Sequence, residues 1–483
     1  MIKKSKILLV DYQSTSNYTL SDEEKYLQRV KKSIIYVQNM KNKRDVSRKT
    51  RKNYSNLLLS LGAYLKKNGH SVFYVSIPSD ENLYKEKLAW ADLVYYWSTT
   101  PVFPLVKDYI ISAKEKYPNI KTILAGYHAT GIPKQILEEV NQIDYISIGE
   151  SEYAIHSIMN GVALEKIPGI AYRENYTVKI NPTPKLLNGD EIPAPDYSLL
   201  NGEKTNYRYY LQMTRSCVYR CKYCVYGYFG GKVRTRSIDS IKQELIELKA
   251  IMGNKFEMHI LDNIISYDIP LLDQLCKLLD ELNMHLSFSA DIRPEMINEE
   301  VLNKLEKINV NQLFIGFEDA NEKCREVAGR KMDSDILVNA LKLIKKHKTI
   351  CANCYWMLGL PGTSKETFVE NINYVQWLIE SKLIENICPD TIFVPLPGTP
   401  LFNEAEKYGI KNLEDNWLNY RRSNYWPVYE LDTISKEDFH EGMLNFDKGI
   451  ISSQLKMLNM SENDVLKRYF NSNNGQNVEE FLK

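Results

Sequence analysis

Three cysteines in one short segment have residue types and spacing that could do chemistry. Cys217, Cys221 and Cys224 lie in MTRSCVYRCKYCVYGYFG, and no fourth cysteine follows nearby. A structural zinc site and an ordinary iron–sulfur cluster each take four protein ligands. Three thiolates on a four-iron cluster would leave one iron open, and an open position is typical of a catalytic metal site. We therefore expect the triplet to hold a cluster with one open position.

Structural zinc is the alternative, and it would need a fourth ligand from elsewhere in the chain. Cys351 and Cys354 are candidates, but CANCYWML has the pattern of a strand, in which positions three apart point to opposite faces. Both thiols therefore cannot easily serve one site. The cysteines outside the triplet are expected to be packing thiols: Cys276, Cys324, Cys351, Cys354 and Cys388.

Basic residues surround the triplet. Arg215, Arg220 and Lys222 flank the thiols and are expected to favour their thiolate form. Arg234 and Arg236, in KVRTRS, either order the cysteine loop or reach a substrate, and the sequence does not separate these roles.

Length and composition limit the classes of protein that the chain can be. It has 483 residues, which at roughly 150 residues per domain suggests about three domains. The net charge of +1 gives no global field for nucleic acid. No stretch approaches the ~20 apolar residues of a membrane span, and MIKKSKILLV has too short an apolar run for a signal peptide. We therefore expect a cytoplasmic protein with reduced thiols.

Residues 1–160 alternate strand-like and helix-like patterns. The strand-like runs are KILLV, SVFYVSI, DLVYYWS, TILAG and DYISIG, separated by helical stretches such as PLVKDYIISAKEKYP. This α/β pattern predicts a Rossmann-like, doubly wound parallel sheet with ligands at the carboxyl ends of its strands. Residues 20–52 do not fit the pattern. We expect a solvated, partly helical insert there, with a substrate or partner contact as the minority alternative.

A second alternating region follows a linker. Residues 161–205 predict a small hairpin and an extended, proline-containing linker. Residues 206–409 contain six strand–helix pairs, with strands at YYLQMT, EMHILD, LSFSAD, NQLFIGF, ANCYWMLG and DTIFVP. Eight pairs close a TIM barrel, so six predict a partial, open barrel with its helices outside. Residues 410–483 are expected to be mainly helical.

The cysteine motif and the segments after it resemble the radical S-adenosylmethionine (SAM) enzymes. CxxxCxxC with Tyr223 before its last cysteine is similar to their cluster-binding motif, and HILDNII, LFIGFEDANEKC, YWMLGLPGTSKET and FVPLPGTPLF follow in the family's order. The resemblance covers most of 205–408. It implies a [4Fe–4S] cluster whose open iron is chelated by SAM, cleavage of SAM to a 5′-deoxyadenosyl radical, and an electron donor such as flavodoxin or ferredoxin.

The first region has a resemblance of its own. ILAGYHATGIPKQILEEVNQIDYISIGESE is similar to the string typical of cobalamin-binding domains fused ahead of radical SAM barrels, which implies cobalamin as a cofactor. Ala125 and Tyr127 stand where that string has glycine and proline, and their bulk narrows the expected site. DYQSTSN lacks the DxHxxG signature, which argues against a histidine lower ligand from that loop.

The resemblance places two sets of residues against cofactors. Those expected near cobalamin, at strand ends of the first domain, are Thr99, Thr100, Gly126, Tyr127, His128 and Gly149. Those expected near SAM, at the barrel mouth, are Tyr223, Asp262, Ser289, Arg293, Glu318 and Gly359. Glu318 could accept from the SAM amine or ribose and Arg293 could pair with its carboxylate, with an internal salt-bridge network as the alternative. For a lone histidine such as His128, ordering its loop is the commoner role.

The resemblance implies a cobalamin-dependent radical SAM enzyme that methylates an unactivated carbon of a small molecule or peptide. The same scaffold could instead run a non-methylating reaction, namely cyclisation, ring contraction or epimerisation. From another class, a cobalamin- or metal-binding sensor without turnover stays open. No second cysteine triplet occurs, which argues against a methylthiotransferase.

Overall fold

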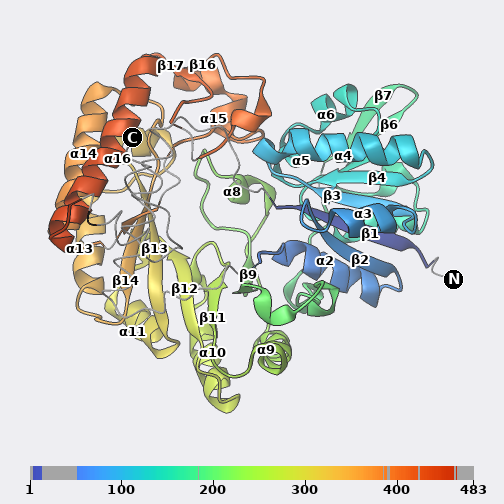
Figure 1. The fold of residues 1–483 in the computed structure, drawn as a ribbon, viewed down its shortest axis with the longest axis horizontal. Coiled ribbons are helices and arrows are strands. Elements are labelled where there is room, and N and C mark those ends of the chain that lie inside the picture. The colour runs from blue at the N-terminus through green and yellow to red at the C-terminus, as the bar shows by residue number, and fades with distance from the viewer. Residues whose placement is uncertain are drawn as a thin grey trace.

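The computed structural model describes residues 4–13, 52–182, 184–384, 386–388, 392–422, 425–461 and 464. Apart from Lys52, the insert expected at 20–52 lies outside the described residues. Figure 1 shows two α/β units side by side, with the C-terminal helix α16 on the outer side of the second.

The first unit is built on a seven-stranded sheet in the order β2-β1-β3-β4-β5-β6-β7. Its strands are β1 (Lys6–Tyr12), β2 (Ser71–Ile77), β3 (Leu93–Trp97), β4 (Lys121–Ala125), β5 (Tyr145–Ser147), β6 (Ile170–Glu174) and β7 (Thr177–Asn181). The first five are parallel, as expected, and the predicted hairpin β6–β7 extends the sheet in antiparallel pairing.

Helices cover both faces of this sheet because its strands are apolar on both sides. The helices are α2 (Asn56–Lys67), α3 (Glu81–Leu88), α4 (Phe103–Lys116), α5 (Tyr127–Gly131), α6 (Pro133–Glu139) and α7 (Glu152–Met159). Leu8 and Val10 of β1 lie in one apolar core with α3, α4 and α6. Ile7 and Leu9 lie in a second core with α2 and α7, and that core continues into the barrel. The first unit therefore docks on the barrel through its α2–α7 face.

The second unit is a six-stranded parallel sheet in the order β15-β14-β13-β12-β11-β8. Its strands are β8 (Tyr209–Leu211), β11 (Glu257–Ile260), β12 (Ser287–Ile292), β13 (Val310–Glu318), β14 (Cys351–Trp356) and β15 (Asn386–Ile387). The helices are α9 (Ile238–Met252), α10 (Ile269–Glu281), α11 (Glu299–Lys307), α12 (Glu322–Val327), α13 (Ser334–Ile344) and α14 (Lys365–Glu380). Burial alternates along β12, so one face packs on helices and the other faces the barrel lumen.

The sixth barrel strand differs from the expectation at DTIFVP. The strand that pairs with β14 is Asn386–Ile387, and of the expected segment Ile392 forms an isolated bridge to Leu358. Residues 389–391 lie outside the described part of the chain. The apolar run 392–394 is instead buried beyond the strand, which is why its composition resembled a strand.

The C-terminal region packs on the outside and the mouth of the barrel. It contains α15 (Pro400–Asn403), the short hairpin β16 (Ile410–Lys411) and β17 (Glu430–Leu431), and α16 (Lys436–Leu458). α16 lies along α14, and Gly442 admits the ring of Phe368 at their contact (Figure 1). Within the described residues, no helix is long and apolar enough to cross a membrane.

Candidate functional site

The cysteine loop follows β8 and is held by short elements of its own. β9 (Thr214–Arg215) pairs antiparallel with β10 (Arg234–Thr235), and α8 (Val225–Phe229) begins directly after the last cysteine. Asp262, just beyond β11, accepts hydrogen bonds at Oδ1 from the N–H groups of Met213 (2.7 Å) and Thr214 (2.9 Å). One carboxylate oxygen of Asp262 therefore anchors the loop. Burial of the Asp262 side chain raises its pKa to about 6.

The three thiols lie close enough to affect one another's ionisation. Burial raises the pKa of Cys217 and raises that of Cys224 to about 11, and the charge of Cys221 adds to both effects. The backbone N–H groups of Tyr219 and Tyr226 lower the pKa of the two thiols only in part. Crowded, buried thiolates therefore need a cationic partner, which iron would supply.

The expectation that Arg215 favours the thiolates is wrong. Its guanidinium turns away from the cysteines and pairs with Glu152 at 2.8 Å, because two buried carboxylates of the first domain lie within reach. Arg220 donates to the carbonyl oxygen of Cys217 at 2.9 Å and so orders the loop backbone.

Arg293 is the cation that approaches a thiol most directly among the described contacts. Its Nη1 lies 3.6 Å from Cys221 Sγ, and its guanidinium carbon lies 3.7 Å from the ring centroid of Tyr219. Glu295 pairs with the other edge of the guanidinium at 2.5 Å. Arg293 therefore lies beside the cysteine loop, and its expected contact with the SAM carboxylate stays a prediction.

The residues present fit a cluster with an open position. Among the described residues, no group of three or more His, Cys, Asp or Glu side chains converges as the ligands of a single metal ion would. The charges of Cys217, Cys221 and Cys224 nevertheless interact, so the three thiols are neighbours in one loop. Cys351 and Cys354 differ in burial along β14, as alternation predicts, and neither joins the triplet.

A buried ionic network joins the cysteine loop to the first domain. Arg234 forms two hydrogen bonds to Glu150, at 2.6 and 2.8 Å, and Arg215 contacts Glu150 at 3.4 Å as well as Glu152. Each of these four side chains is no more than 12% exposed. Arg236 pairs with buried Glu244 of α9. Arg234 also donates to the carbonyl oxygen of Gly230 and Arg236 to that of Gln212, contacts that order the loop.

A cavity of about 300 Å³ lies where the first domain meets the cysteine loop. The first domain contributes Trp97, Gly126, Tyr127 and Gly149, and the barrel contributes Ser216, Tyr226 and Asn263, among other residues. Tyr127 and Tyr226 meet edge to face across it, with ring centroids 5.3 Å apart. Tyr226 is 44% exposed, yet desolvation raises its pKa, as expected for a side chain that lines a deep cavity.

The expected cobalamin residues divide into two groups. Gly126, Tyr127 and Gly149 line this cavity, and Gly126 has φ +103° with its backbone against Ser98. Because Gly126 and Gly149 have no Cβ, a flat ring in the cavity can approach their backbone closely. A volume near 300 Å³ lies at the lower end of the range of ligand sites in proteins.

The other three residues lie away from the cavity lining. Thr99 caps the short turn after β3, and Thr100 is buried. His128 is fully buried between Phe103 and Trp417, at ring distances of 4.5 and 4.8 Å, and neither ring nitrogen has a hydrogen-bond partner among the described residues. Desolvation lowers its pKa to about 3, so it packs as a neutral ring.

The residues expected near SAM are also spread over different roles. Tyr223 is buried, and Glu318, with φ +81°, pairs with Arg330 at 3.1 Å, as in the salt-bridge alternative. Ser289 lies on the lumen face of β12. Gly359, with φ +91°, accepts a hydrogen bond from the Tyr429 hydroxyl at 2.7 Å, so the C-terminal region covers that turn.

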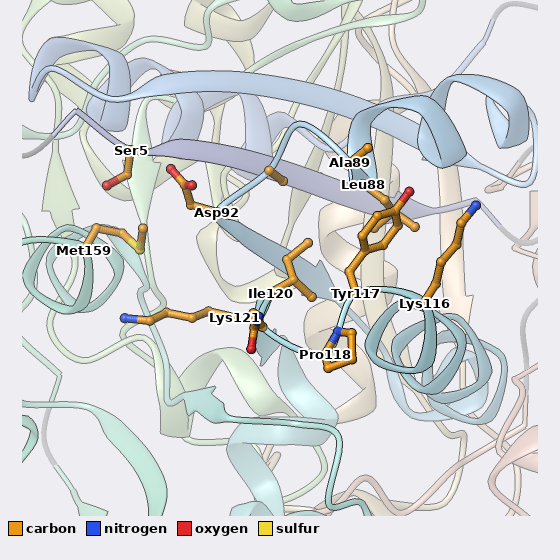
Figure 2. Close-up of a pocket in the computed structure, with 12 residues that line it drawn as sticks. Ser5, Leu88, Ala89, Asp92, Lys116, Tyr117, Pro118, Ile120, Lys121 and Met159 are labelled. Atoms are coloured by element: carbon orange, nitrogen blue, oxygen red, sulfur yellow. The ribbon is translucent and has the colours of Figure 1, made fainter.

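A larger cavity of about 510 Å³ lies at the opposite edge of the first sheet. Figure 2 shows Asp92, Tyr117, Lys121 and Met159 around it, where the strands begin rather than end. Ligands of doubly wound sheets bind at the carboxyl edge, and no residue of the cysteine loop lines this space. We therefore do not place the chemistry there.

Sequence reasoning missed the carboxylates of the interdomain network and the lumen residue His259. Glu150 and Glu152 were visible as GESE at the end of the fifth strand pattern, and that motif was the available signal. His259 alternates with the buried positions of β11, but a single histidine in a strand gives no distinctive signal.

Comparison with known proteins gives two family matches. Residues 211–375 match the Radical SAM superfamily, and residues 54–158 match the B12 binding domain. These matches imply a [4Fe–4S] cluster, SAM and cobalamin as cofactors.

Relatives and solved structures agree with this arrangement. An uncharacterised methyltransferase of Pyrococcus horikoshii is 27% identical over 338 residues, covering 67% of this chain and 71% of that protein. An anaerobic magnesium-protoporphyrin IX monomethyl ester cyclase of Synechocystis sp. is 22% identical over 334 residues, covering 65% of this chain and 66% of that protein. The structure of the cobalamin-dependent S-adenosylmethionine radical enzyme OxsB, with aqua-cobalamin and S-adenosylmethionine bound, has a TM-score of 0.69 at 14% identity, covering 96% of this chain and 78% of that chain. The chain described here is therefore a radical SAM enzyme with a B12-binding domain ahead of its barrel.

Proposed function

We propose that this enzyme transfers a methyl group to an unactivated carbon of a small-molecule or peptide substrate. When bound, the cluster would supply the electron that cleaves SAM, and cobalamin would carry the methyl group. The observation that carries the proposal is the shared cavity, whose lining comes from both the B12-binding domain and the cysteine loop. A substrate there would lie within reach of both chemistries.

The chain's own residues would hold and shield these groups. Cys217, Cys221 and Cys224 would bind the cluster, with the Arg293 guanidinium beside Cys221. Gly126 and Tyr127 would face the corrin. The network of Glu150, Glu152, Arg215 and Arg234 would fix the two sites relative to each other, because it joins the two domains through buried contacts.

Methyl transfer is tested by the fate of SAM. Anaerobically reconstituted protein with cobalamin, SAM and dithionite is assayed for 5′-deoxyadenosine and for S-adenosylhomocysteine, with Cys217→Ala as the matched control. A methyltransferase forms both compounds. We expect Cys217→Ala to lose 5′-deoxyadenosine formation, because it removes a cluster ligand.

A non-methylating radical reaction is the second candidate, and the similarity to a ring-forming cyclase favours it. It would yield 5′-deoxyadenosine without S-adenosylhomocysteine. That outcome would overturn methyl transfer and leave the radical chemistry intact. Formation of neither compound would contradict both candidates.

A further inference from the structure

The lumen face of the barrel carries a polar cluster that neither the cysteine loop nor the interdomain network uses. His259, Ser289 and Asp291 come from two neighbouring strands, and Tyr355 comes from β14. Strand register brings them together: His259 lies opposite Ser289, and Asp291 lies opposite Phe314 of β13. Their neighbours in sequence are buried against the helices, so these side chains face the lumen.

The contacts within the cluster leave one acceptor open. His259 Nδ1 lies 2.9 Å from Ser289 Oγ, and His259 Nε2 lies 3.4 Å from Asp291 Oδ2. Both ring nitrogens are therefore engaged. Asp291 Oδ1 has no hydrogen bond of good geometry within the described residues, and the Tyr355 hydroxyl lies near the same carboxylate, so that burial and the charge of Asp291 both raise the pKa of Tyr355. A buried carboxylate oxygen in this condition lacks a donor that a ligand could supply.

Aromatic rings form the wall beside that carboxylate. Phe314 and Tyr355 stack with ring centroids 5.7 Å apart and an interplanar angle of 27°, and Phe314 also contacts His259 at 6.1 Å. Tyr355 is 37% exposed, so its ring is open to the lumen. Burial, and to a smaller extent the charge of Asp291, raise the pKa of Tyr226 in the cysteine loop, so Asp291 lies on the side of the lumen that faces this loop.

A carboxylate beside exposed aromatic faces is the chemistry that recognises a protonated amine. The carboxylate supplies an opposite charge and acceptors, and the rings attract a cation through their faces. A neutral alcohol of the same shape as the amine would make the same contacts with the rings, but it would lack the charge–charge attraction to the carboxylate.

We propose that Asp291, with the Phe314–Tyr355 wall, binds an amine of the substrate and so selects amine-bearing substrates. This inference rests on the proposed function, because it assigns the substrate class of that site. Asp291 is a specificity-determining residue in this proposal, and His259 positions its carboxylate.

The test compares a cation with its neutral counterpart. Binding of 2-phenylethylamine and of 2-phenylethanol to the reconstituted enzyme is measured at pH 7 by ligand-observed NMR titration, with and without SAM. We expect the amine to bind roughly tenfold or more tightly than the alcohol, since a charge-assisted hydrogen bond is lost in the alcohol. Asp291→Asn keeps the shape and removes this preference. Asp280→Asn, on the exposed face of α10, retains it.

Tyr355→Ala is the second variant. It should weaken binding of the amine and of the alcohol by the same factor, because it removes part of the aromatic wall and leaves the charge of Asp291 in place. Equal binding of the two probes by the unmodified enzyme, or a preference that survives Asp291→Asn, overturns the inference. It is also overturned if SAM displaces the amine and Asp291→Asn weakens SAM binding, because Asp291 then belongs to the SAM site. A retained amine preference without S-adenosylhomocysteine formation would instead contradict methyl transfer alone.

Discussion

Arg293 lies beside Cys221, one of the three thiols proposed to bind the cluster. Its Nη1 lies 3.6 Å from Cys221 Sγ, with the guanidinium stacked on Tyr219. A positive charge and a hydrogen bond at a cluster sulfur stabilise the reduced, more negative cluster. We expect Arg293→Leu to lower the reduction potential of the bound cluster by on the order of tens of millivolts. Redox titration followed by electron paramagnetic resonance checks this, with exposed Arg208→Leu as the control; equal potentials in the two variants would contradict it.

Asp319 makes folding stability depend on pH. It is fully buried just beyond β13, and its Oδ1 accepts hydrogen bonds from Asn371 Nδ2 (2.9 Å) and the Asn321 N–H (2.8 Å). Burial raises its pKa from 3.8 to about 7. The folded state therefore binds this proton more tightly than the unfolded state does. The free energy of unfolding should fall as pH rises from about 4 to about 7 and then level off.

Asp319→Asn should remove this pH dependence while keeping the Oδ1 acceptor. Between pH 5 and pH 8, the difference in free energy of unfolding between the two proteins should change by about 2–3 kcal/mol, in favour of the variant at high pH. Urea denaturation at the two pH values measures it. Parallel pH profiles for the two proteins would show that Asp319 has an ordinary pKa in the folded state.

At the scale of single elements, the turn after β4 is the one that most restricts what can occupy the interdomain cavity. Gly126 has φ +103°, and a Cβ there would lie 2.1 Å from the carbonyl oxygen of Ser98. Gly126→Ala must therefore move the strand end that lines the cavity. Gly161 has φ +72°, and no atom of the described residues lies within 4 Å of a Cβ built there, so Gly161→Ala costs only the backbone strain of about 1 kcal/mol.

We expect Gly126→Ala to weaken cobalamin binding, measured by titration of the visible absorbance, and to destabilise the protein more than Gly161→Ala. Gly161→Ala should bind cobalamin as the unmodified protein does. Equal binding by the two variants would mean that the cofactor does not rest on the Gly126 turn.

The elements that sequence predicted well are those with strong local periodicity. Strands such as β12 and β13 alternate or run apolar over their whole length, and the five parallel strands of the first sheet are confirmed. α3 and α7 were not anticipated. α3 is short and largely exposed, with buried Tyr84 and Leu88, so its apolar pattern is weak. The sixth barrel strand has two residues, too few for any period to show.

The site was predictable where one local motif defines it and not where distant segments meet. CxxxCxxC predicts three cluster ligands without help from tertiary structure, and the match of residues 211–375 to the Radical SAM superfamily agrees with the chemistry that the motif implies. Arg215 stands two residues before Cys217, so its sequence neighbourhood suggested a role at the thiols. Its actual partner, Glu152, is 63 residues away and comes from the other domain. Burial of a guanidinium favours whichever carboxylates are closest in space, and sequence spacing does not contain that information.

The molecule as a whole depends on this interdomain contact because the two domains share a continuous apolar core. Residues of β1, α2 and α7 pack in the same core as the barrel strands. Charged groups inside such an interface must be paired. Arg215 donates to Glu152 at 2.8 Å and to Ser60 Oγ at 3.0 Å, and its Nε has no partner in the part of the chain that the structure describes.

Glu152→Ala should therefore destabilise the whole molecule rather than one domain. It leaves Arg215 buried with the neutral Ser60 hydroxyl and with one longer ion pair, to Glu150 at 3.4 Å, and removing one partner of a buried pair costs about 3–5 kcal/mol. Glu138→Ala, which removes an exposed partner of Lys134 at 3.8 Å, should cost at most about 1 kcal/mol. Urea denaturation followed by circular dichroism gives both values. The double variant Glu152→Leu, Arg215→Met should regain most of the loss, because no charge stays unpaired in the interface. If Glu152→Ala costs no more than Glu138→Ala, the network does not hold the domains together, and the apolar core alone sets the distance between the cysteines and the first domain.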